Sequence, residues 1–588
     1  MTRPTSWTIG LSTHDFRVRI GGDPSPSLTL AAQPGARALL EPVAPACPIE
    51  LALPGLRLRG DDFAVTAFHE GRDAAIATCV AGNVEARLVW RTGALEAVRL
   101  LIQLRATGSD TPIDGTLRLA ILDHIHPGAR GRTPAHDPGQ GPLAPDGRPL
   151  ARSRRYPLPH SWWSPDGGVA ILARYAANTQ EGARWQAILQ TVPVRLRPEW
   201  LDACELVFMA CAPGWQGVFA ALRGQVRADL DLSEYARPDL AWYHSQWLQH
   251  FTFLYGREIF DHARGQLDVD RLLDDGRRFG GYDGVLLWPA YPRMGVDERG
   301  QWDFYDDLPG GRAGLRALTE RARARGIRVF IPYLPWDAPP EARRGMAPIA
   351  AEELARVVAD SGVDGVFLDT MKNVVSGFRQ AIDRVRAGVV FCSEGQPDGD
   401  AIARITGSWD QGEHRHAGEV DLARFLFPEH PSFMVNRHAV GFHREAVIAR
   451  ALFNGTGLVV WQDVFGEILP YTDAQAASVR ATVTILRRYA ALFRGADALP
   501  LVPTARPDVY ANAFVAGDGR AALTVYNGSD AAIDGDLVSW THDPDQRWAC
   551  VDEHGRMGAT GDRARGEILP GHVAVFVSSP RHAGQSEG

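Results

Sequence analysis

Residues 362–394 read GVDGVFLDTMKNVVSGFRQAIDRVRAGVVFCSE, and this pattern predicts a strand, a helix and a second strand. The apolar run 366–368 stops at Asp369, and the run 389–392 is followed, one serine later, by Glu394. Between the two runs, apolar residues recur at helical spacing. Continuous apolar runs joined by a crossover helix are typical of neighbouring parallel strands with both faces covered. Two carboxylates are therefore expected at the carboxyl ends of adjacent strands, where α/β folds place their active sites.

The same alternation of strand and helix patterns continues over residues 239–496 and predicts an α/β fold, a (β/α)8 TIM barrel. A barrel of this kind takes about 250 residues. A Rossmann-type sheet is the alternative, but no GxGxxG motif follows a predicted strand. The strands are predicted at 251–255, 284–288, 329–334, 365–368, 389–392, 425–427 and 458–461.

Short strand patterns on both sides of the barrel predict two β-domains. Residues 1–238 carry many such patterns between Gly, Pro and Asp turns, which is typical of a β-sandwich. Strand patterns resume over residues 497–580 and predict a small C-terminal β-sandwich. The polar residues 581–588 are expected to form a disordered tail.

The composition is that of a globular protein and excludes several classes of partner. The 588 residues are 45% hydrophobic and 22% charged, with a net charge of −8. This balance argues against a nucleic acid as partner. No stretch is apolar over the length that a membrane span needs. The first residues contain no apolar segment of signal-peptide length, so a cytoplasmic location is expected. Nothing in the sequence indicates an oligomeric state.

The six cysteines indicate neither a disulfide framework nor a metal site. They are scattered along the chain, without a CxxC pair and without histidines at metal-ligand spacing. Buried free thiols are therefore expected. The sequence also contains no P-loop, GxSxG or HExxH motif. Neither a metal nor a cofactor is predicted.

Paired carboxylates at neighbouring strand ends suit the hydrolysis of a glycosidic bond. Adjacent strands lie about 4.8 Å apart, close to the ~5–5.5 Å between the carboxyl groups of a retaining glycosidase. Lys372 follows Asp369 closely and would keep that carboxylate ionised, as a nucleophile requires. Glu394 has no cation within three residues, which suits a proton donor. A single acid at a strand end equally fits a helix cap or a loop salt bridge, so the pair carries the prediction.

Aromatic and polar side chains follow several of the predicted strands and fit a sugar site. An aromatic ring packs under a pyranose ring, and carboxylates accept hydrogen bonds from its hydroxyls. Each tryptophan taken alone also fits a place in the core. The candidate substrate-binding residues are Trp288, Tyr291, Trp336, Asp337, Lys372, Trp409, Asp410, Trp461 and Asp463.

With these residues in place, the chain resembles the (β/α)8-barrel glycoside hydrolases that act on α-glycosides. Asp369, in the segment GVFLD at 365–369, matches the strand-4 nucleophile of the α-galactosidase-like and α-glucosidase-like families. A strand-4 Asp with a strand-5 Glu is also similar to the α-amylase clan and the endo-α-N-acetylgalactosaminidase-like families, in which the Glu is the proton donor. This resemblance implies an acid/base role for Glu394.

Two departures leave the family open. The α-amylase clan has an Arg two residues before its nucleophile, where this chain has Phe367. The α-galactosidase-like families take their acid/base from an Asp on strand 6, for which Asp410 is the candidate. The resemblance covers the barrel and one short motif, and it matches no single family closely.

These observations predict a retaining glycoside hydrolase that cleaves an α-glycosidic bond of an oligosaccharide or glycoside. Asp369 is the expected nucleophile and Glu394 the expected acid/base. In one alternative, Asp410 replaces Glu394 as the acid/base. In the other, the chain is a catalytically silent carbohydrate-binding protein, since a fold does not by itself dictate a function.

Overall fold

The computed structural model divides into two compact units, residues 1–229 and 230–588. Hydrophobic clusters form the core of each unit. In the part of the chain that the structure describes, no helix is long and apolar enough to cross a membrane. The described residues are 16–21, 27–32, 47, 49–71, 74–93, 97–108, 110–120, 136–137, 141–152, 156, 158–164, 167–175, 184–186, 191–289, 301–335, 346–397, 399–411, 418–438, 443–495 and 497–579.

Two antiparallel sheets form most of the first unit, in addition to two strand pairs, β1 (Phe16–Gly21) with β2 (Ser27–Ala32) and β10 (His136–Asp137) with β11 (Gly141–Pro142). The larger sheet has the order β13-β14-β17-β8-β7-β6-β5, with β15 beside β14, and the smaller has the order β16-β9-β3-β4. The strands of the larger sheet are β5 (Ala64–Glu70), β6 (Ala74–Ala81), β7 (Val84–Gly93), β8 (Ala97–Ala106), β13 (His160–Ser164), β14 (Gly167–Tyr175), β15 (Arg184–Gln186) and β17 (Leu201–Cys211). Those of the smaller are β3 (Glu50–Leu53), β4 (Leu56–Leu58), β9 (Ile113–Arg118) and β16 (Val192–Leu196). Helix α1 (Gly214–Arg227) packs against β14 and β17.

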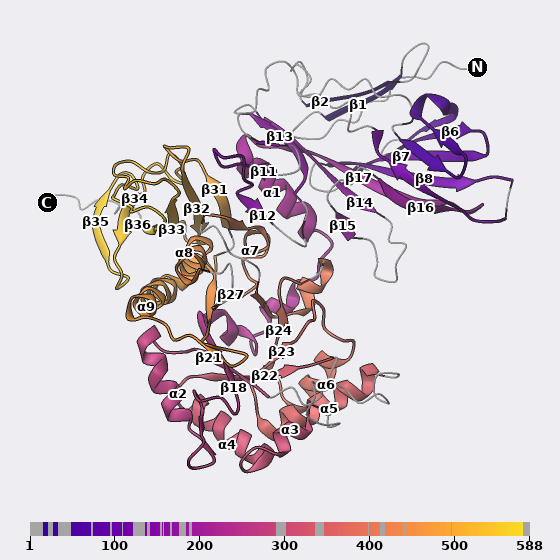
Figure 1. The fold of residues 1–588 in the computed structure, drawn as a ribbon. Helices are drawn as coiled ribbons and strands as arrows, with labels where there is room; N and C mark the ends of the chain where they lie inside the picture. The colour runs from indigo at the N-terminus through magenta and orange to yellow at the C-terminus, as the bar shows by residue number, and fades with distance from the viewer. Residues whose placement is uncertain are drawn as a thin grey trace. The chain divides into compact units, whose positions relative to one another are not determined.

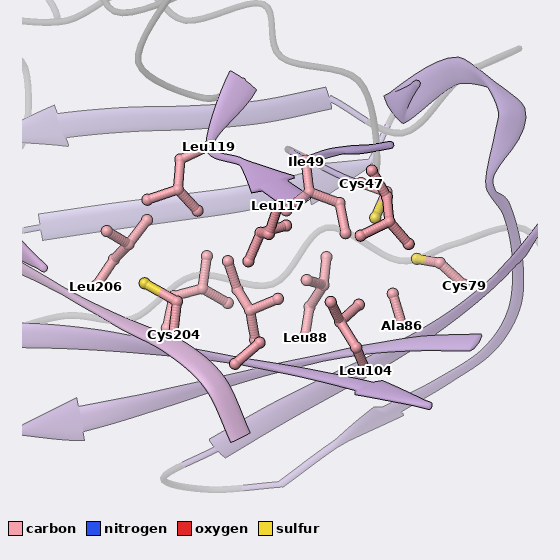
Figure 2. Packing of buried hydrophobic residues seen from close by; sticks show 14 of the residues in the cluster. Cys47, Ile49, Cys79, Ala86, Leu88, Leu104, Leu117, Leu119, Cys204 and Leu206 are labelled. Atoms are coloured by element: carbon pink, nitrogen blue, oxygen red, sulfur yellow. The ribbon is translucent and has the colours of Figure 1, made fainter. Parts of the chain in front are cut away.

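An apolar core lies between these two sheets (Figure 2). Strand β8 shows the strand period of two, since alternate residues such as Leu100, Ile102 and Leu104 are fully buried. Figure 2 shows Leu104 of the larger sheet and Leu117 of the smaller sheet on opposite sides of this core. Two sheets that bury their inner faces against each other form the predicted β-sandwich.

The second unit contains the predicted closed barrel of eight parallel strands (Figure 1). Strand order follows the chain, and the last strand pairs with the first. The strands are β18 (Leu248–Phe253), β21 (Gly284–Trp288), β22 (Arg328–Tyr333), β23 (Gly365–Leu368), β24 (Val390–Glu394), β25 (Gly407–Asp410), β27 (Ser432–Arg437) and β28 (Gly457–Trp461). Strands β21, β23 and β28 are buried along their whole length, which explains their continuous apolar sequences.

Helices lie outside the barrel strands, as Figure 1 shows for α2, α4, α5 and α6. Capping residues determine where some of them begin and end. Helix α9 begins with a capping box, because the side chains of Thr472 and Gln475 each accept a hydrogen bond from the other's backbone N–H. Helix α8 ends at Gly455, whose φ is 62°. The helices are α2 (Val269–Gly276), α3 (Asp303–Asp306), α4 (Gly311–Arg323), α5 (Met346–Ser361), α6 (Phe378–Val385), α7 (Leu422–Leu426), α8 (Arg444–Asn454), α9 (Asp473–Arg488) and α10 (Ala490–Phe493).

The predicted strand at 425–427 is wrong, because these residues form the end of helix α7 and the residue that follows it. Asp421 caps this helix by accepting a hydrogen bond from the backbone N–H of Ala423 at 3.2 Å. The strand at this point of the barrel is instead β27. A short, fully buried segment has the same continuous apolar sequence whether it is a strand or a helix, so the sequence pattern does not distinguish the two.

After the barrel, an antiparallel sheet forms in the order β31-β32-β33-β36-β34-β35. Its core also contains Ile533, Leu537 and Ile568, which lie outside the strands. Ile533 and Ile568 form an isolated β-bridge, so these segments add a second layer over the sheet. The strands are β31 (Asp497–Val502), β32 (Val509–Val515), β33 (Ala521–Asn527), β34 (Arg547–Val551), β35 (Met557–Gly561) and β36 (Val573–Ser579).

Candidate active site

Three consecutive barrel strands end at a carboxylate. Asp369 directly follows β23, Glu394 is the last residue of β24, and Asp410 is the last residue of β25. Parallel pairing joins β23 to β24 and β24 to β25. The carboxyl ends of parallel strands meet at one end of a barrel. The fold therefore gathers the two predicted catalytic acids and the alternative acid at that end.

The strand register brings Asp369 and Glu394 level with each other. The residues that directly precede them are paired across β23 and β24. Phe367 and Cys392, two residues before each acid, belong to the apolar core inside the barrel. Because side chains alternate along a strand, both acids continue rows that face the barrel interior.

Glu394 is held by hydrogen bonds to both of its carboxylate oxygens. The backbone N–H of Thr370 donates to Oε2 at 2.6 Å, and Gln411 Nε2 donates to Oε1 at 3.0 Å. Thr370 has a φ of 57°, a left-handed conformation that is strained for a β-branched residue. This strained residue directly follows Asp369, so the Thr370 bond ties the Glu394 carboxylate to the end of β23.

A guanidinium group lies within electrostatic reach of Glu394. It belongs to Arg437, the last residue of β27. Burial lowers the pKa of Arg437, and the negative charge of Glu394 partly opposes this shift. The seventh strand therefore contributes a positive charge near Glu394, so the lack of a cation close in sequence does not hold in the folded chain.

Lys372 lies beside the turn that follows Glu394. A Cβ atom added to Gly395 would come within 2.7 Å of Lys372 Nζ, and Gly395 has a φ of 79°. Both observations favour glycine at this position, because a side chain would meet the ammonium group and strain the backbone. Lys372, expected beside Asp369 from its place in the sequence, closely approaches Gly395 in the structure.

A second carboxylate, Asp421, interacts with Asp410. Asp421 is 2% exposed, accepts a hydrogen bond from the Gln396 side chain and caps helix α7. Burial raises the pKa of Asp421 to about 7, and the negative charge of Asp410 adds to this rise. Asp421 was not predicted from the sequence. The one feature that indicates it is an Asp directly before a short helix, the position of an N-cap.

The candidate tryptophans on described strands pack inside the barrel. Trp288, Trp409 and Trp461 are 3%, 2% and 5% exposed. The ring of Trp461 stacks on Phe251 with centroids 4.1 Å apart, and the ring of Trp409 lies 4.7 Å from that of Phe367. These rings form an aromatic layer at the ends of their strands, and their contact with a substrate stays a prediction.

Asp463 shapes a hairpin that follows the last barrel strand. Strand β29 (Asp463–Val464) pairs with β30 (Glu467–Ile468), and the backbone N–H of Gly466 donates to Asp463 Oδ1 at 2.7 Å. The Asp463 carbonyl accepts a hydrogen bond from the indole N–H of Trp461. One carboxylate oxygen of this candidate is thus used within the hairpin, and its role in binding stays a prediction.

Three candidates, Tyr291, Trp336 and Asp337, lie outside the described residues. Within the described ranges, no group of three or more His, Cys, Asp and Glu side chains is arranged to hold a metal ion. The sequence analysis missed Gln411 and Arg437. Gln411 directly follows the candidate Asp410, whereas Arg437 ends a strand that the sequence pattern did not reveal.

No protein-family model matches the sequence, and no curated protein matches it. Solved structures do match the fold. A GH36 α-galactosidase AgaA variant from Geobacillus stearothermophilus, solved with 1-deoxygalactonojirimycin, has a TM-score of 0.56 at 12% identity, covering 98% of this chain and 100% of that one. The AgaB enzyme of the same organism has a TM-score of 0.57 at 11% identity, with 98% of each chain covered. The galactosidase domain of the α-galactosidase–sucrose kinase AgaSK has a TM-score of 0.54 at 11% identity, again covering 98% of each chain.

At these identities the likeness concerns the fold. It confirms a (β/α)8 barrel with flanking β-domains, the architecture that the sequence predicted. The chain therefore has the fold of the solved GH36 α-galactosidases.

Proposed function

We propose that the chain is a retaining glycoside hydrolase that cleaves an α-glycosidic bond by double displacement. The observation that carries this proposal is the pair Asp369 and Glu394, level with each other on inward-facing rows of adjacent strands. The hydrogen bond from Thr370 to Glu394 supports it, because it links the two strand ends at 2.6 Å. The α-galactosidase fold supports the choice of reaction class.

The proposed reaction has two steps. First, the Asp369 carboxylate attacks the anomeric carbon while Glu394 transfers its proton to the leaving oxygen, so the glycosidic bond breaks and a glycosyl ester forms. Second, Glu394 takes a proton from water, which attacks the anomeric carbon and releases Asp369. Two inversions at one carbon return the original configuration. Arg437 would steady the negative charge that Glu394 carries between the two steps.

The acid/base has a second candidate, Asp410. Asp410 lies within electrostatic reach of a second acid, the buried Asp421, and paired carboxyl groups are typical of acid/base sites. The α-galactosidase-like resemblance also assigns the acid/base to a sixth strand, and β25 is the sixth strand of the barrel. Glu394 would then orient the substrate through its fixed carboxylate. The inward row of Glu394 favours the first assignment.

An α-galactoside is the first substrate to test, because related AgaA structures contain raffinose and stachyose. The binding residues we propose are the sequence candidates Trp288, Tyr291, Trp336, Asp337, Lys372, Trp409, Asp410, Trp461 and Asp463. Proton NMR of a digest of 4-nitrophenyl α-D-galactopyranoside tests the proposal. We expect the α-anomer of galactose to appear first, and no turnover in an Asp369→Ala variant with a normal melting temperature.

Two outcomes would contradict this function. Early appearance of the β-anomer would indicate inversion of configuration and a different use of the carboxylates. Saccharide binding without turnover, across α-galactosides and α-glucosides, would favour the catalytically silent binding protein instead.

A further inference from the structure

The hairpin that follows the last barrel strand holds an aromatic residue in an unusual backbone conformation. Phe465 has a φ of 54° and lies between β29 and β30, directly before Gly466 at 88°. Among the described residues, positive φ at a non-glycine position occurs only at Thr370, Phe465 and Leu501. A left-handed conformation costs an aromatic residue about 1–2 kcal/mol. The surrounding hairpin must therefore hold Phe465 in place.

Several hydrogen bonds hold this turn. Asp463 Oδ1 accepts from Gly466 N at 2.7 Å, inside the hairpin. At its base, Leu469 N donates to the Gln462 carbonyl at 3.2 Å, and Arg444 Nη2 donates to the Leu469 carbonyl at 2.7 Å. The hairpin is thus a braced element that keeps its tip in one conformation.

The ring of Phe465 is 62% exposed, although one side of it touches other aromatic rings. Its centroid lies 5.6 Å from that of Trp461 and 5.9 Å from that of Phe253, the last residues of β28 and β18. An exposed ring adds little to the stability of the core, and the strained backbone at this residue lowers stability. An aromatic ring held in one conformation with an exposed face suits contact with the apolar face of a ligand.

A chain of contacts leads from this ring to the proposed catalytic acids. The Arg437 guanidinium lies 5.6 Å above the ring of Trp461, and the charge of Arg437 interacts with that of Glu394. The hairpin extends beyond the carboxyl end of β28, which is the end of the barrel that carries the acids. Phe465 therefore lies in a hairpin at the rim of the barrel, beyond the strand ends, whereas the carboxylates lie at the strand ends themselves.

We propose that Phe465 is the platform for a pyranose ring on the leaving-group side of an oligosaccharide substrate. The C–H groups of a pyranose present an apolar face, which packs against an exposed aromatic ring as it packs against other apolar surface. The inference rests on the proposed function and adds to it a binding site for the sugar that departs. It predicts that Phe465 matters for oligosaccharides and not for substrates without a sugar leaving group.

Kinetics of paired substrates test this role. Raffinose has a disaccharide leaving group, whereas α-D-galactosyl fluoride releases only fluoride. In Phe465→Ala we expect kcat/KM to fall about tenfold for raffinose, equivalent to ~1.4 kcal/mol, and to stay within twofold for the fluoride. Ala, like Phe, carries a Cβ, so the backbone strain at the positive φ of this residue is similar in the variant. Phe465→Tyr keeps the ring and should restore the raffinose value.

A matched control is Leu569→Ala, which removes another exposed apolar side chain, 52% exposed, from the C-terminal sheet region. It should change neither substrate's kinetics. Equal losses for raffinose and the fluoride in Phe465→Ala would overturn the proposal, as would no loss for either. A change confined to concentration-dependent self-association, measured by sedimentation, would assign the ring to a contact between copies of the chain and also overturn it.

Failure of the proposed function gives a different result. If the wild type hydrolyses neither substrate, saturation-transfer NMR with raffinose still reports binding. Loss of that signal in Phe465→Ala but not in Leu569→Ala would support the platform without catalysis. Absence of raffinose binding to the wild type, or equal binding by both variants, would overturn the platform.

Discussion

At the scale of single residues, the strongest question is which acid donates the proton. We expect Glu394→Gln to lower kcat on raffinose by about 10²–10⁴-fold, with a smaller loss on α-D-galactosyl fluoride, since fluoride leaves without protonation. With the fluoride, azide should raise the residual rate and give the α-glycosyl azide, because breakdown of the glycosyl ester on Asp369 then limits turnover and azide attacks that ester without a general base. Asp410→Asn is the matched variant. If Asp410→Asn shows this pattern and Glu394→Gln does not, the acid/base is Asp410.

Gly395 offers a second test at this scale, with a built-in control. Gly395→Ala adds a Cβ 2.7 Å from Lys372 Nζ at a φ of 79°, whereas Gly519→Ala adds one at a φ of 83° with nothing within 4 Å. Both variants should lose about 1–2 kcal/mol of stability from the backbone alone. Gly395→Ala should also lose catalytic activity, because the added Cβ displaces the Lys372 ammonium group from the turn that follows Glu394. Thermal melts and kcat/KM on 4-nitrophenyl α-D-galactopyranoside check this, and full activity in Gly395→Ala would contradict it.

At the scale of elements, the capping residue of α7 should make stability depend on pH. The pKa of Asp421 is raised from 3.8 to about 7 in the folded chain. Between these values the folded state binds more protons than the unfolded state, so stability falls as pH rises from about 4 to 7. Asp421→Asn keeps the acceptor oxygen for the Ala423 N–H and cannot ionise. Relative to the wild type, this variant should gain stability over that range, by on the order of 1–3 kcal/mol.

Urea unfolding at several pH values measures that difference. Asp421→Ala is the control, since it removes both the charge and the cap, and losing a cap costs about 1 kcal/mol. A wild type and an Asp421→Asn variant with parallel pH profiles would show that Asp421 does not titrate in this range.

How well a helix or strand could be predicted from the sequence depended on its length and on how far it is buried. The pattern predicted β21 and β23 with their observed bounds, because a parallel strand buried on both faces has a continuous apolar sequence. It misplaced residues 425–427, because α7 is only five residues long and fully buried. Strand β27 was missed for a related reason, since its sequence SFMVNR ends in two polar residues.

At the scale of the whole molecule, the first unit should unfold as a cooperative domain. Its core contains Leu104, which is fully buried, and this core does not include residues of the barrel. Leu104→Ala removes buried methyl groups and should destabilise this unit by about 2–5 kcal/mol. Hydrogen exchange should then rise in β7, β8 and β17 and stay unchanged in β21–β24. Uniformly faster exchange across the whole chain would show that the two units unfold together.

Sequence patterns alone predicted the barrel, the flanking β-domains and the position of Asp369 and Glu394 at the ends of consecutive strands. Each of these follows from local patterns, because the periodicity of apolar residues reports which side chains are buried. Only the tertiary structure decided what surrounds the acids. Thr370, Gln411 and Arg437 approach Glu394 from three different strand ends, and Asp421 interacts electrostatically with Asp410. Barrel closure brings residues distant in sequence to one mouth, so these contacts depend on register and packing, which no local pattern contains.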